Sequence, residues 1–481
     1  SDELRTQSHR DTETRSHGET LEDLNGMGFF DRFKSKAGDT PAADAPNRAI
    51  MIGLDGTPCS LLSRLAADGT MPNVAKLLGT GTLKSMTTTI PEISSVAWSS
   101  FMTGTNPGKH GVYGFLDLKP SSYKIYFPNA THVKGDTLWD VLNKHGKRAV
   151  VVNVPSTYPA REINGVLISG FVAIQLERAT WPLSLIPRLK EVGYQIDVDA
   201  RKKKESDEAL MADVFHTLER REIILLELFK QEKWDLFIGV ITETDRLQHF
   251  FWEAIEDPNH KFHARFREFY GRVDECIGKI ADAAGPNDRL FLMSDHGFAP
   301  LNQQVYLNYW LNQNGFLNWT KPVAESLEDI GPGTTAFAMD PARIYINVRG
   351  KYPLGHVDPA DYAAVRDRLK AELATIEVDG VRIIDRIFTK EEIFTGPLLD
   401  VAPDLCLLPV KGYDLKGAVN KTVLHDRDVF TGMHTQDDAL FWIGGGSPVS
   451  GDATIYDVAP TILDALGIAK PEVMDGRSLL S

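Results

Sequence analysis

Hydrophobic residues along this chain alternate between two patterns. Short runs of consecutive apolar residues, typical of strands buried on both faces, occur at 49–54, 148–154, 236–241, 289–293 and 439–444. Between them, apolar residues recur at helical spacing in longer stretches, which are 61–78 with a break at 69–72, 94–104, 135–146, 207–230, 261–284 and 456–466. This alternation predicts an α/β fold with a mostly parallel central sheet flanked by helices.

Two segments depart from the alternation. Residues 156–233 end in the long helical stretch, and we expect them to form an insertion or lid. Residues 301–424, with a strand pattern at 343–348 and a helical pattern near 361–373, are expected to form a cap insertion. The core is then assembled from three separate pieces of the chain, which are 48–155, 234–300 and 425–481.

Residues 1–47 are polar and charged and show little hydrophobic periodicity, which is typical of a mobile tail. An apolar island at 26–33 interrupts them, and we expect it to dock on the surface of its own domain. The first residues lack the apolar core of a signal peptide, although a chain that begins at Ser1 rather than at a methionine is compatible with a removed leader.

Composition and charge narrow the class of protein. The 481 residues are 42% hydrophobic and 25% charged, enough for one large domain with insertions or for two to three smaller domains. The 52 basic and 66 acidic residues give a net charge of -14, which opposes wrapping of nucleic acid or binding to an anionic membrane. The basic run from Arg201 to Lys204 is interpreted as a solvated turn before an acidic helix start.

Cysteine usage and hydropathy favour a cytosolic protein without a membrane span. Cys59, Cys276 and Cys406 are odd in number and widely spaced, so neither a disulfide framework nor a zinc ribbon is indicated. The sequence contains no run of about 18 apolar residues that could span a bilayer. A reducing cytosol is the expected location, and the sequence leaves the oligomeric state open.

Side chains that bind metals follow two of the predicted strands. Asp55 directly follows the strand at 49–54, where an aspartate is ordinarily a helix N-cap. Asp245 and His249 follow the strand at 236–241 at a spacing of four, so in a helix they face the same side and can hold one ion. Each of these residues alone would have an ordinary structural explanation. Their recurrence at the ends of strands is what indicates a site.

A third strand, at 289–293, ends in the pair Asp295–His296. Adjacent residues in a strand point to opposite faces, but Gly297 lets the backbone bend so that both can reach one site. His434 lies in a predicted loop before the last apolar strand. Six nitrogen and oxygen ligands at one end of a sheet are too many for one tetrahedral ion and suit two. Zinc is expected from the mixture of His and Asp, and manganese is the alternative because carboxylates are half of the ligands.

A nucleophile is available at the start of the helical stretch at 94–104. Ser94 stands where the free backbone N–H groups and the dipole of a helix favour phosphate. Helix capping is the ordinary role of such a serine, and Ser95 is a competitor on sequence chemistry alone. A serine beside two metal ions indicates phosphoryl chemistry.

Taken together, these motifs resemble the alkaline phosphatase superfamily. Within it, the likeness is to the type I phosphodiesterase and nucleotide pyrophosphatase group, especially its bacterial phosphohydrolases or phosphomutases. The matching motifs are Gly53-Leu54-Asp55-Gly56, the block from Pro91 to Gly111, Thr244-Asp245-Arg246-Leu247-Gln248-His249, Ser294-Asp295-His296-Gly297 and Gly432-Met433-His434. They span roughly Arg48 to Leu480, and the resemblance implies an alkaline-phosphatase-like α/β sandwich with inserted lid or cap segments.

Carried over motif by motif, the resemblance implies two metal ions with separate ligands. These are Asp245, His249 and His434 for one ion, and Asp55, Asp295, His296 and the Ser94 oxygen for the other. Family members usually carry threonine at the nucleophile position, so Ser94 is a mild departure. Residues 94–98 lack the proline and arginine of the sulfatase motif Cys/Ser-x-Pro-x-Arg, which makes the chain a poor match to sulfatases.

The expected activity is therefore that of a two-metal phosphohydrolase, foremost a phosphodiesterase that acts on a phosphorylated small molecule or phosphodiester through a phosphoseryl intermediate at Ser94. A phosphomutase or phosphotransferase, or a phosphomonoesterase, is the alternative, and a non-catalytic metal-stabilised scaffold is the least favoured. The inserted segments are expected to select the substrate. Lys109, Arg246 and the basic run at 201–204 are interpreted as structural or solvated rather than as phosphate ligands.

Overall fold

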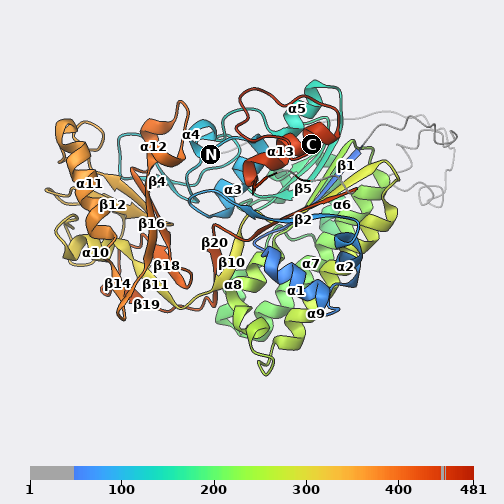
Figure 1. Cartoon of the computed structure of the whole chain (residues 1–481), viewed down its shortest axis with the longest axis horizontal. Helices are drawn as coiled ribbons and strands as arrows, with labels where there is room; N and C mark the ends of the chain where they lie inside the picture. Colours follow the sequence, from blue (N-terminus) through green and yellow to red (C-terminus); the bar gives the residue numbers. More distant parts are fainter. Residues whose placement is uncertain (1–47, 446–448, 450, 481) are drawn as a thin grey trace, which may run out of the picture. The chain divides into compact units, whose positions relative to one another are not determined.

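The structure, a computed structural model, describes residues 48–445, 449 and 451–480. The predicted tail at 1–47, with its apolar island at 26–33, lies outside the described residues. Within them, nine strands join into one central sheet (Figure 1), in the order β22 (Ala453–Thr454), β2 (Gly81–Thr87), β21 (Ala439–Gly444), β9 (Asp288–Met293), β1 (Arg48–Leu54), β8 (Leu236–Ile241), β5 (Ala149–Val154), β6 (Gly165–Ser169) and β7 (Thr180–Trp181).

Parallel pairing dominates the middle of this sheet. From β9 to β6, each strand is parallel to the next, so Ile52 of β1 lies opposite Leu292 of β9 on one side and Gly239 of β8 on the other. Only β21 and β7 run antiparallel to their described neighbours. The predicted α/β fold with a mostly parallel sheet is confirmed.

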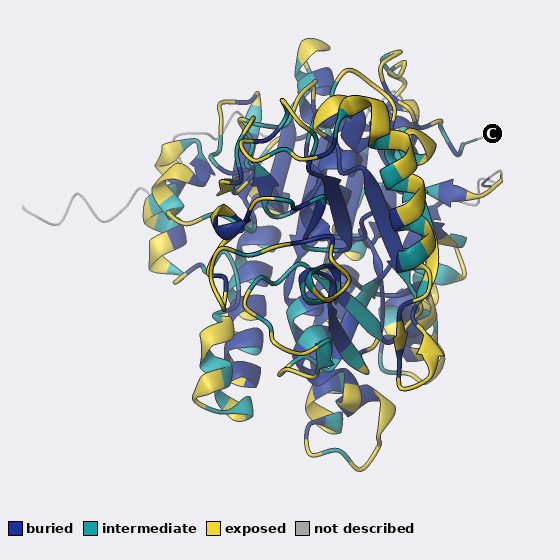
Figure 2. Ribbon diagram, turned by 90° about the vertical axis from the view of Figure 1, so that its left-hand side faces the viewer, coloured by how far each residue is buried: buried dark blue, intermediate teal, exposed yellow. Residues whose placement is uncertain are grey.

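Helices cover both faces of the sheet, because the central strands carry apolar side chains on both faces. One face packs against α1 (Cys59–Ala67), α2 (Pro72–Leu78), α7 (Asp207–Gln231), α8 (Glu243–Glu256) and α9 (His263–Ala283). The other packs against α3 (Ser94–Thr103), α5 (Leu138–Lys144) and α13 (Ile455–Ala465). In β1, Ile50 and Ile52 belong to the first core, and Ala49 and Met51 to the second. Figure 2 shows these buried strands beneath helices whose outer surfaces are exposed.

The stretch at 156–233 contributes to the layered core. It supplies β6 and β7 to the edge of the central sheet, and α7 packs against β5 and β8. The short helix α6 (Ile186–Glu191) lies between these elements in the sequence. Within this stretch, the apolar run of β6 extends only from Val166 to Ile168, and so short a run does not identify a strand by its pattern alone.

The segment at 301–424 has a hydrophobic core of its own. Its antiparallel sheet contains β12 (Ala336–Met339), β13 (Arg343–Ile346), β17 (Leu405–Pro409) and β16 (Ile384–Thr389), and its helices are α10 (Leu307–Gln313), α11 (Tyr362–Leu373) and α12 (Lys390–Ile393). A three-stranded sheet joins β18 (Tyr413–Lys416), β11 (Gln303–Tyr306) and β19 (His425–Asp426). The buried Arg343 pairs with Asp117 at 2.6 Å, so the hairpin of β3 (Asp117–Leu118) and β4 (Ile125–Tyr126) packs on this segment.

Two short strands, β10 (Gly297–Pro300) and β20 (Gly432–Thr435), pair antiparallel just beyond the carboxyl end of β9. They bring a late part of the chain to the strand ends that carry the predicted ligands. The three cysteines are buried and form no disulfide. In the part of the chain that the structure describes, no helix is both long enough and apolar enough to cross a membrane.

Candidate active site

The carboxyl ends of three adjacent strands meet at one edge of the sheet and place the predicted ligands there. In the register of β1, Leu54 lies opposite Ile241 of β8, and Gly53 lies opposite Met293 of β9. The polar residues that follow each strand therefore emerge at the same level. This geometry explains why motifs far apart in the sequence form one site.

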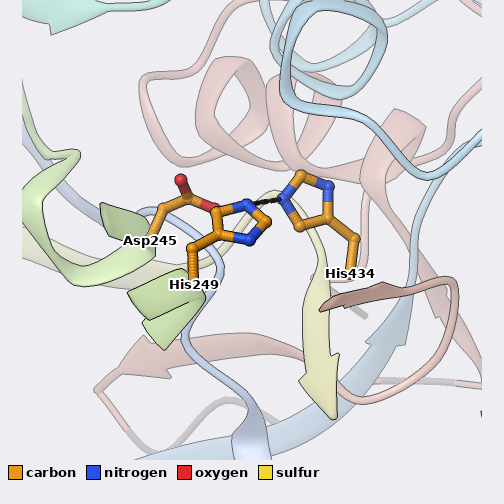
Figure 3. A group of neighbouring side chains, drawn as sticks. All are labelled: Asp245, His249 and His434. Atoms are coloured by element: carbon orange, nitrogen blue, oxygen red, sulfur yellow. Dashed lines mark hydrogen bonds and ion pairs between the residues drawn. The ribbon is translucent and has the colours of Figure 1, made fainter. Parts of the chain in front are cut away.

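The first ligand group consists of Asp245, His249 and His434, whose ligand atoms all lie within 4.8 Å of one another. Asp245 and His249 come from the start of α8, on the same side of the helix as their spacing predicts. His434 Nε2 lies 3.1 Å from Asp245 Oδ1 and 2.9 Å from His249 Nε2. Figure 3 shows the two imidazole rings facing each other beside the carboxylate.

His434 lies in strand β20 and not in the loop that the sequence pattern indicates. It pairs with Phe298 of β10 in the antiparallel ladder, and the Phe298 ring contacts the imidazole rings of His434 and His249. A four-residue strand that contains Gly432 and one ligand has no alternating hydrophobic pattern, so the sequence could not reveal it. The ladder fixes the height of His434 relative to α8.

The second group consists of Asp55, Asp295 and His296, again with ligand atoms within 4.8 Å of one another. His296 Nε2 lies 3.3 Å from Asp295 Oδ2 and 3.8 Å from Asp55 Oδ1. The backbone N–H of Gly56 donates to Asp295 Oδ1 at 3.0 Å, and Gly56 adopts a left-handed φ of 65°. All three ligands are buried.

Gly297, which follows the pair Asp295–His296, is required by a close backbone contact. A Cβ at this position would lie 2.2 Å from the carbonyl oxygen of Asp437. The chain can therefore pass this close to Asp437 directly after the pair only because Gly297 has no side chain.

Ser94 is the first residue of α3, and its Oγ lies 3.2 Å from His296 Nε2. The N-cap of α3 is Ile93, so helix capping does not account for Ser94. It lines a cavity of about 40 Å³ that the Asp55 and Asp245 side chains also line. The Ser95 Oγ does not line this cavity, and it is buried without a hydrogen-bond partner among the described residues. The structure therefore distinguishes the two serines.

The three histidines share one orienting arrangement. The Nδ1 atoms of His249, His296 and His434 lie 3.1, 3.0 and 3.0 Å from the backbone carbonyl oxygens of Gly432, Gly297 and Glu92 respectively. A carbonyl only accepts, so each Nδ1 must carry the proton and each Nε2 presents a lone pair to the site. Histidines that bind metals are typically held in this way.

The donor chemistry of both groups fits divalent metal ions. In the first, the lone pairs of two Nε2 atoms face each other at 2.9 Å, an arrangement that only a proton or a metal cation between them makes favourable. In the second, Asp55 Oδ1 and Asp295 Oδ2 are buried without a hydrogen-bond partner among the described residues. Buried carboxylate oxygens without partners are costly unless a cation balances them.

Electrostatic effects differ between the two groups. Burial raises the pKa of Asp295 to about 7, and burial together with the neighbouring Asp295 raises the pKa of Asp55. Burial also opposes the ionised form of Asp245, but His249, His434 and Arg246 outweigh it and hold the pKa of Asp245 well below its usual range. Burial lowers the pKa of His249 to about 4, so this ring is neutral and able to bind metal.

The three basic features that the sequence leaves outside the site have different environments. Lys109 Nζ contacts Asp475 Oδ1 and the Val473 carbonyl, away from the ligands. The run at 201–204 forms a short 3-10 turn in which Arg201, Lys202 and Lys203 each pair with an aspartate. Arg246, in contrast, lines the same cavity as Ser94.

Comparison with known proteins identifies the family. The model of the type I phosphodiesterase / nucleotide pyrophosphatase family matches residues 49–437, most of the chain. The chain belongs to this family. Its members hydrolyse phosphoric esters, and the family predicted from the motifs is confirmed, as is the enzyme class. A search of curated proteins found no match.

Solved structures show the same fold as this phosphodiesterase-family chain. Phosphonoacetate hydrolase from Sinorhizobium meliloti 1021, in complex with phosphonoformate, aligns with a TM-score of 0.60 at 17% identity, covering 88% of this chain and 96% of that one. Murine ectonucleotide pyrophosphatase / phosphodiesterase 5 aligns with a TM-score of 0.54 at 13% identity, covering 90% and 100% respectively. The likeness establishes the alkaline-phosphatase-like fold over nearly the whole chain.

Proposed function

We propose that the protein is a two-metal phosphohydrolase, foremost a phosphodiesterase, in which Ser94 is the nucleophile. The observation that supports this most directly is the position of the Ser94 Oγ. It lies 3.2 Å from a ligand nitrogen of the second group, in a cavity lined by residues of both groups. A hydroxyl placed between two ligand groups can approach a phosphorus atom whose oxygens face both.

The residues that would hold the ions are the two groups described above, with the Ser94 Oγ joining the second. Bound divalent ions would lower the pKa of the Ser94 hydroxyl and balance the charge on the phosphoryl oxygens. The first group, with two imidazoles and one carboxylate, favours zinc. The second, with two carboxylates and one imidazole, accepts zinc or manganese.

The reaction consists of two displacements at phosphorus. The Ser94 hydroxyl gives up its proton and its Oγ forms a bond to phosphorus while the bond to the leaving oxygen breaks, and the leaving alkoxide takes up a proton. A water oxygen then bonds to phosphorus, the bond to Ser94 breaks, and the serine regains a proton. Each in-line displacement inverts phosphorus, so the proposal requires net retention of configuration.

Assays of the metal-loaded protein on aryl phosphodiesters and aryl phosphomonoesters test the proposal. Ser94→Ala should lower kcat by at least about a thousandfold, because the nucleophile is lost. Ser95→Ala is the matched control and should retain activity, since the Ser95 hydroxyl lies outside the cavity. An acid quench during turnover should trap a covalent adduct on the peptide that contains Ser94, which is phosphate from a monoester and an aryl phosphoryl group from a diester.

Undiminished turnover by Ser94→Ala would remove Ser94 from the mechanism. A faster rate on monoesters than on diesters would favour a phosphomonoesterase. Transfer of the phosphoryl group to an added alcohol, without release of phosphate, would instead favour a phosphotransferase or mutase that uses the same serine. Inversion at a chiral phosphorothioate would contradict the two-step reaction.

A further inference from the structure

Arg246 occupies a place in the site that its position in the sequence does not reveal. It follows the ligand Asp245 in the first turn of α8, and its side chain is 20% exposed. With Asp55 and Ser94, it lines the cavity of about 40 Å³ where the proposed nucleophile lies. Among the described residues, no other arginine or lysine lines this cavity.

Contacts on three sides hold the guanidinium group of Arg246 in place. Its Nε and Nη2 donate to the two carboxylate oxygens of Asp197 at 3.1 and 2.7 Å. Its Cζ lies over the ring of Phe171, 4.6 Å from the ring centroid, and Phe171 packs edge-on against Phe115. Its Nη1 donates to Asp245 Oδ2 at 3.3 Å.

These contacts leave a directed donor available. A guanidinium has five N–H groups, and the bonds to Asp197 and Asp245 use one each at Nε, Nη2 and Nη1. Nη1 and Nη2 each retain a second N–H, and Nη1 is the nitrogen that also contacts the cavity-lining Asp245. Because the group is already fixed, a ligand that accepts this N–H orders little additional side chain on binding. Asp197 balances the charge of Arg246, so its contribution is mainly a directed hydrogen bond.

We propose that Arg246 is a substrate-binding residue of this site, and that its Nη1 donates to a non-bridging oxygen of the phosphoryl group. The assignment rests on the proposed function, which places that group in the cavity beside Ser94. A guanidinium held by a carboxylate and an aromatic ring suits a tetrahedral oxyanion. Asp197 and Phe171, which come from the stretch at 156–233, are then positioning residues for Arg246.

A competing role is purely structural. Through its 3.3 Å contact, Arg246 could act only on Asp245 and so on metal affinity. The two roles predict different results, because a residue that binds the phosphoryl group changes the affinity for phosphate at unchanged metal content. A residue that only positions Asp245 changes metal content and phosphate affinity together.

Calorimetry with inorganic phosphate on the metal-loaded protein separates these roles without relying on turnover. Arg246→Gln should weaken phosphate binding by about 10- to 100-fold, the effect of losing one charge-assisted hydrogen bond, with metal content equal to that of the parent protein. Arg246→Lys should recover only part of the affinity, because an ammonium group cannot reproduce the fork to Asp197.

The chain offers a matched control in Arg188, which forms a similar fork. Its Nε and Nη2 contact Glu227 at 2.8 to 3.1 Å, and it is 27% exposed, but it lies outside the cavity. Arg188→Gln should bind phosphate as the parent protein does. A loss of affinity in this variant equal to that in Arg246→Gln would mean that general destabilisation is being measured.

Parent-like phosphate affinity in Arg246→Gln, or a metal loss that accounts for the whole effect, would overturn the assignment. If Arg246→Gln fails to fold, Arg246→Lys carries the same test, and parent-like affinity in it would overturn the directional role. A parent protein that binds phosphate through Arg246 but turns over no ester would reject the hydrolase proposal and leave this assignment standing. A metal-loaded parent protein that binds no phosphate would overturn the assignment of Arg246.

Discussion

The two ligand groups are built from the same residue types in opposite proportions. The first combines one carboxylate, Asp245, with two imidazoles, and the second combines two carboxylates, Asp55 and Asp295, with one imidazole. Burial differs as well, because the side chains of His249 and His434 retain 19% and 15% exposure, whereas His296 has none. Composition and burial together set how strongly each group depends on a cation.

The first group has a way to balance its own charge. Burial opposes a proton on His434, but the hydrogen bond to Asp245 outweighs it and raises the pKa of His434. A shared proton can then stand in for a metal ion, and Arg246 adds a further positive charge beside Asp245. The second group has no comparable proton-sharing histidine among the described residues. Its two carboxylates repel each other, and burial lowers the pKa of His296, so this histidine is neutral.

This difference indicates that the second site is the one whose carboxylates require metal. Removing metal should leave the first group nearly undisturbed and leave two buried like charges in the second. We therefore expect replacement of a carboxylate to change the stability of the metal-free protein in opposite directions at the two groups.

The largest effect is expected from isosteric replacement of the carboxylate ligands. Asp295→Asn and Asp245→Asn should each lower kcat/KM by about a thousandfold or more, because loss of an ion's anchor removes several kcal/mol of charge stabilisation. Their stabilities without metal should diverge. With chelator at about pH 8, Asp295→Asn should unfold at a higher temperature than the parent, since it removes repulsion with Asp55.

Asp245→Asn should unfold at a lower temperature under the same conditions, because its neutral amide loses attraction to His434 and Arg246. Differential scanning calorimetry of both variants and the parent makes the comparison directly. Equal shifts of the same sign would show that the two groups do not differ in their need for a cation.

A smaller effect is expected from the residue that orients Asp55. The buried indole N–H of Trp98 donates to Asp55 Oδ2 at 2.9 Å. Trp98→Phe should weaken metal binding at the second group by about 10- to 100-fold, the usual effect of removing a partner of a ligand. Activity should return at high metal concentration, which a metal titration of the rate would show.

Trp442→Phe provides the control for the change in ring volume. Trp442 is also buried, but its indole N–H has no hydrogen-bond partner among the described residues. This variant should keep the parent's metal requirement. A raised metal requirement in both variants would assign the effect to packing instead of to the bond with Asp55.

Local patterns in the sequence were sufficient to predict the middle strands of the sheet and the clustering of the candidate ligands at their ends, because both depend on short-range features. An apolar strand followed by a ligand can be seen in a few residues, and parallel strands place their carboxyl ends together. Helices such as α7 and α9 were predicted to within a few residues from periodicity alone. The interrupted stretch at 61–78 forms α1 and α2, which divide at the predicted break.

The environment of Arg246 could not be predicted because it depends on residues distant in the chain. Asp197 and Phe171 reach it from the stretch at 156–233, and Phe115 comes from the first core piece. None of these three residues carries a local motif that marks it as a neighbour of Ser94. The different surroundings of Ser94 and Ser95 likewise could not be predicted, since both serines have the same chemistry.

The smallest predicted effect is a dependence of stability on pH in the protein without metal. The pKa of Asp295 is about 7 in the folded chain, raised by burial, and about 3.9 for an unperturbed aspartate. Between these values the folded protein binds more protons than the unfolded chain, so the free energy of unfolding falls as pH rises from about 4 to about 7. The raised pKa of Asp55 acts in the same direction.

Chelated protein should therefore lose roughly a few degrees of Tm between about pH 5 and about pH 7, and bound metal should remove this slope because it favours the ionised carboxylates. Asp295→Asn should flatten the slope, whereas Asp245→Asn should leave it, because the pKa of Asp245 lies well below this range. A slope that survives in Asp295→Asn would place its origin outside the second group, and the contrast between the two sites would then rest on metal affinity alone.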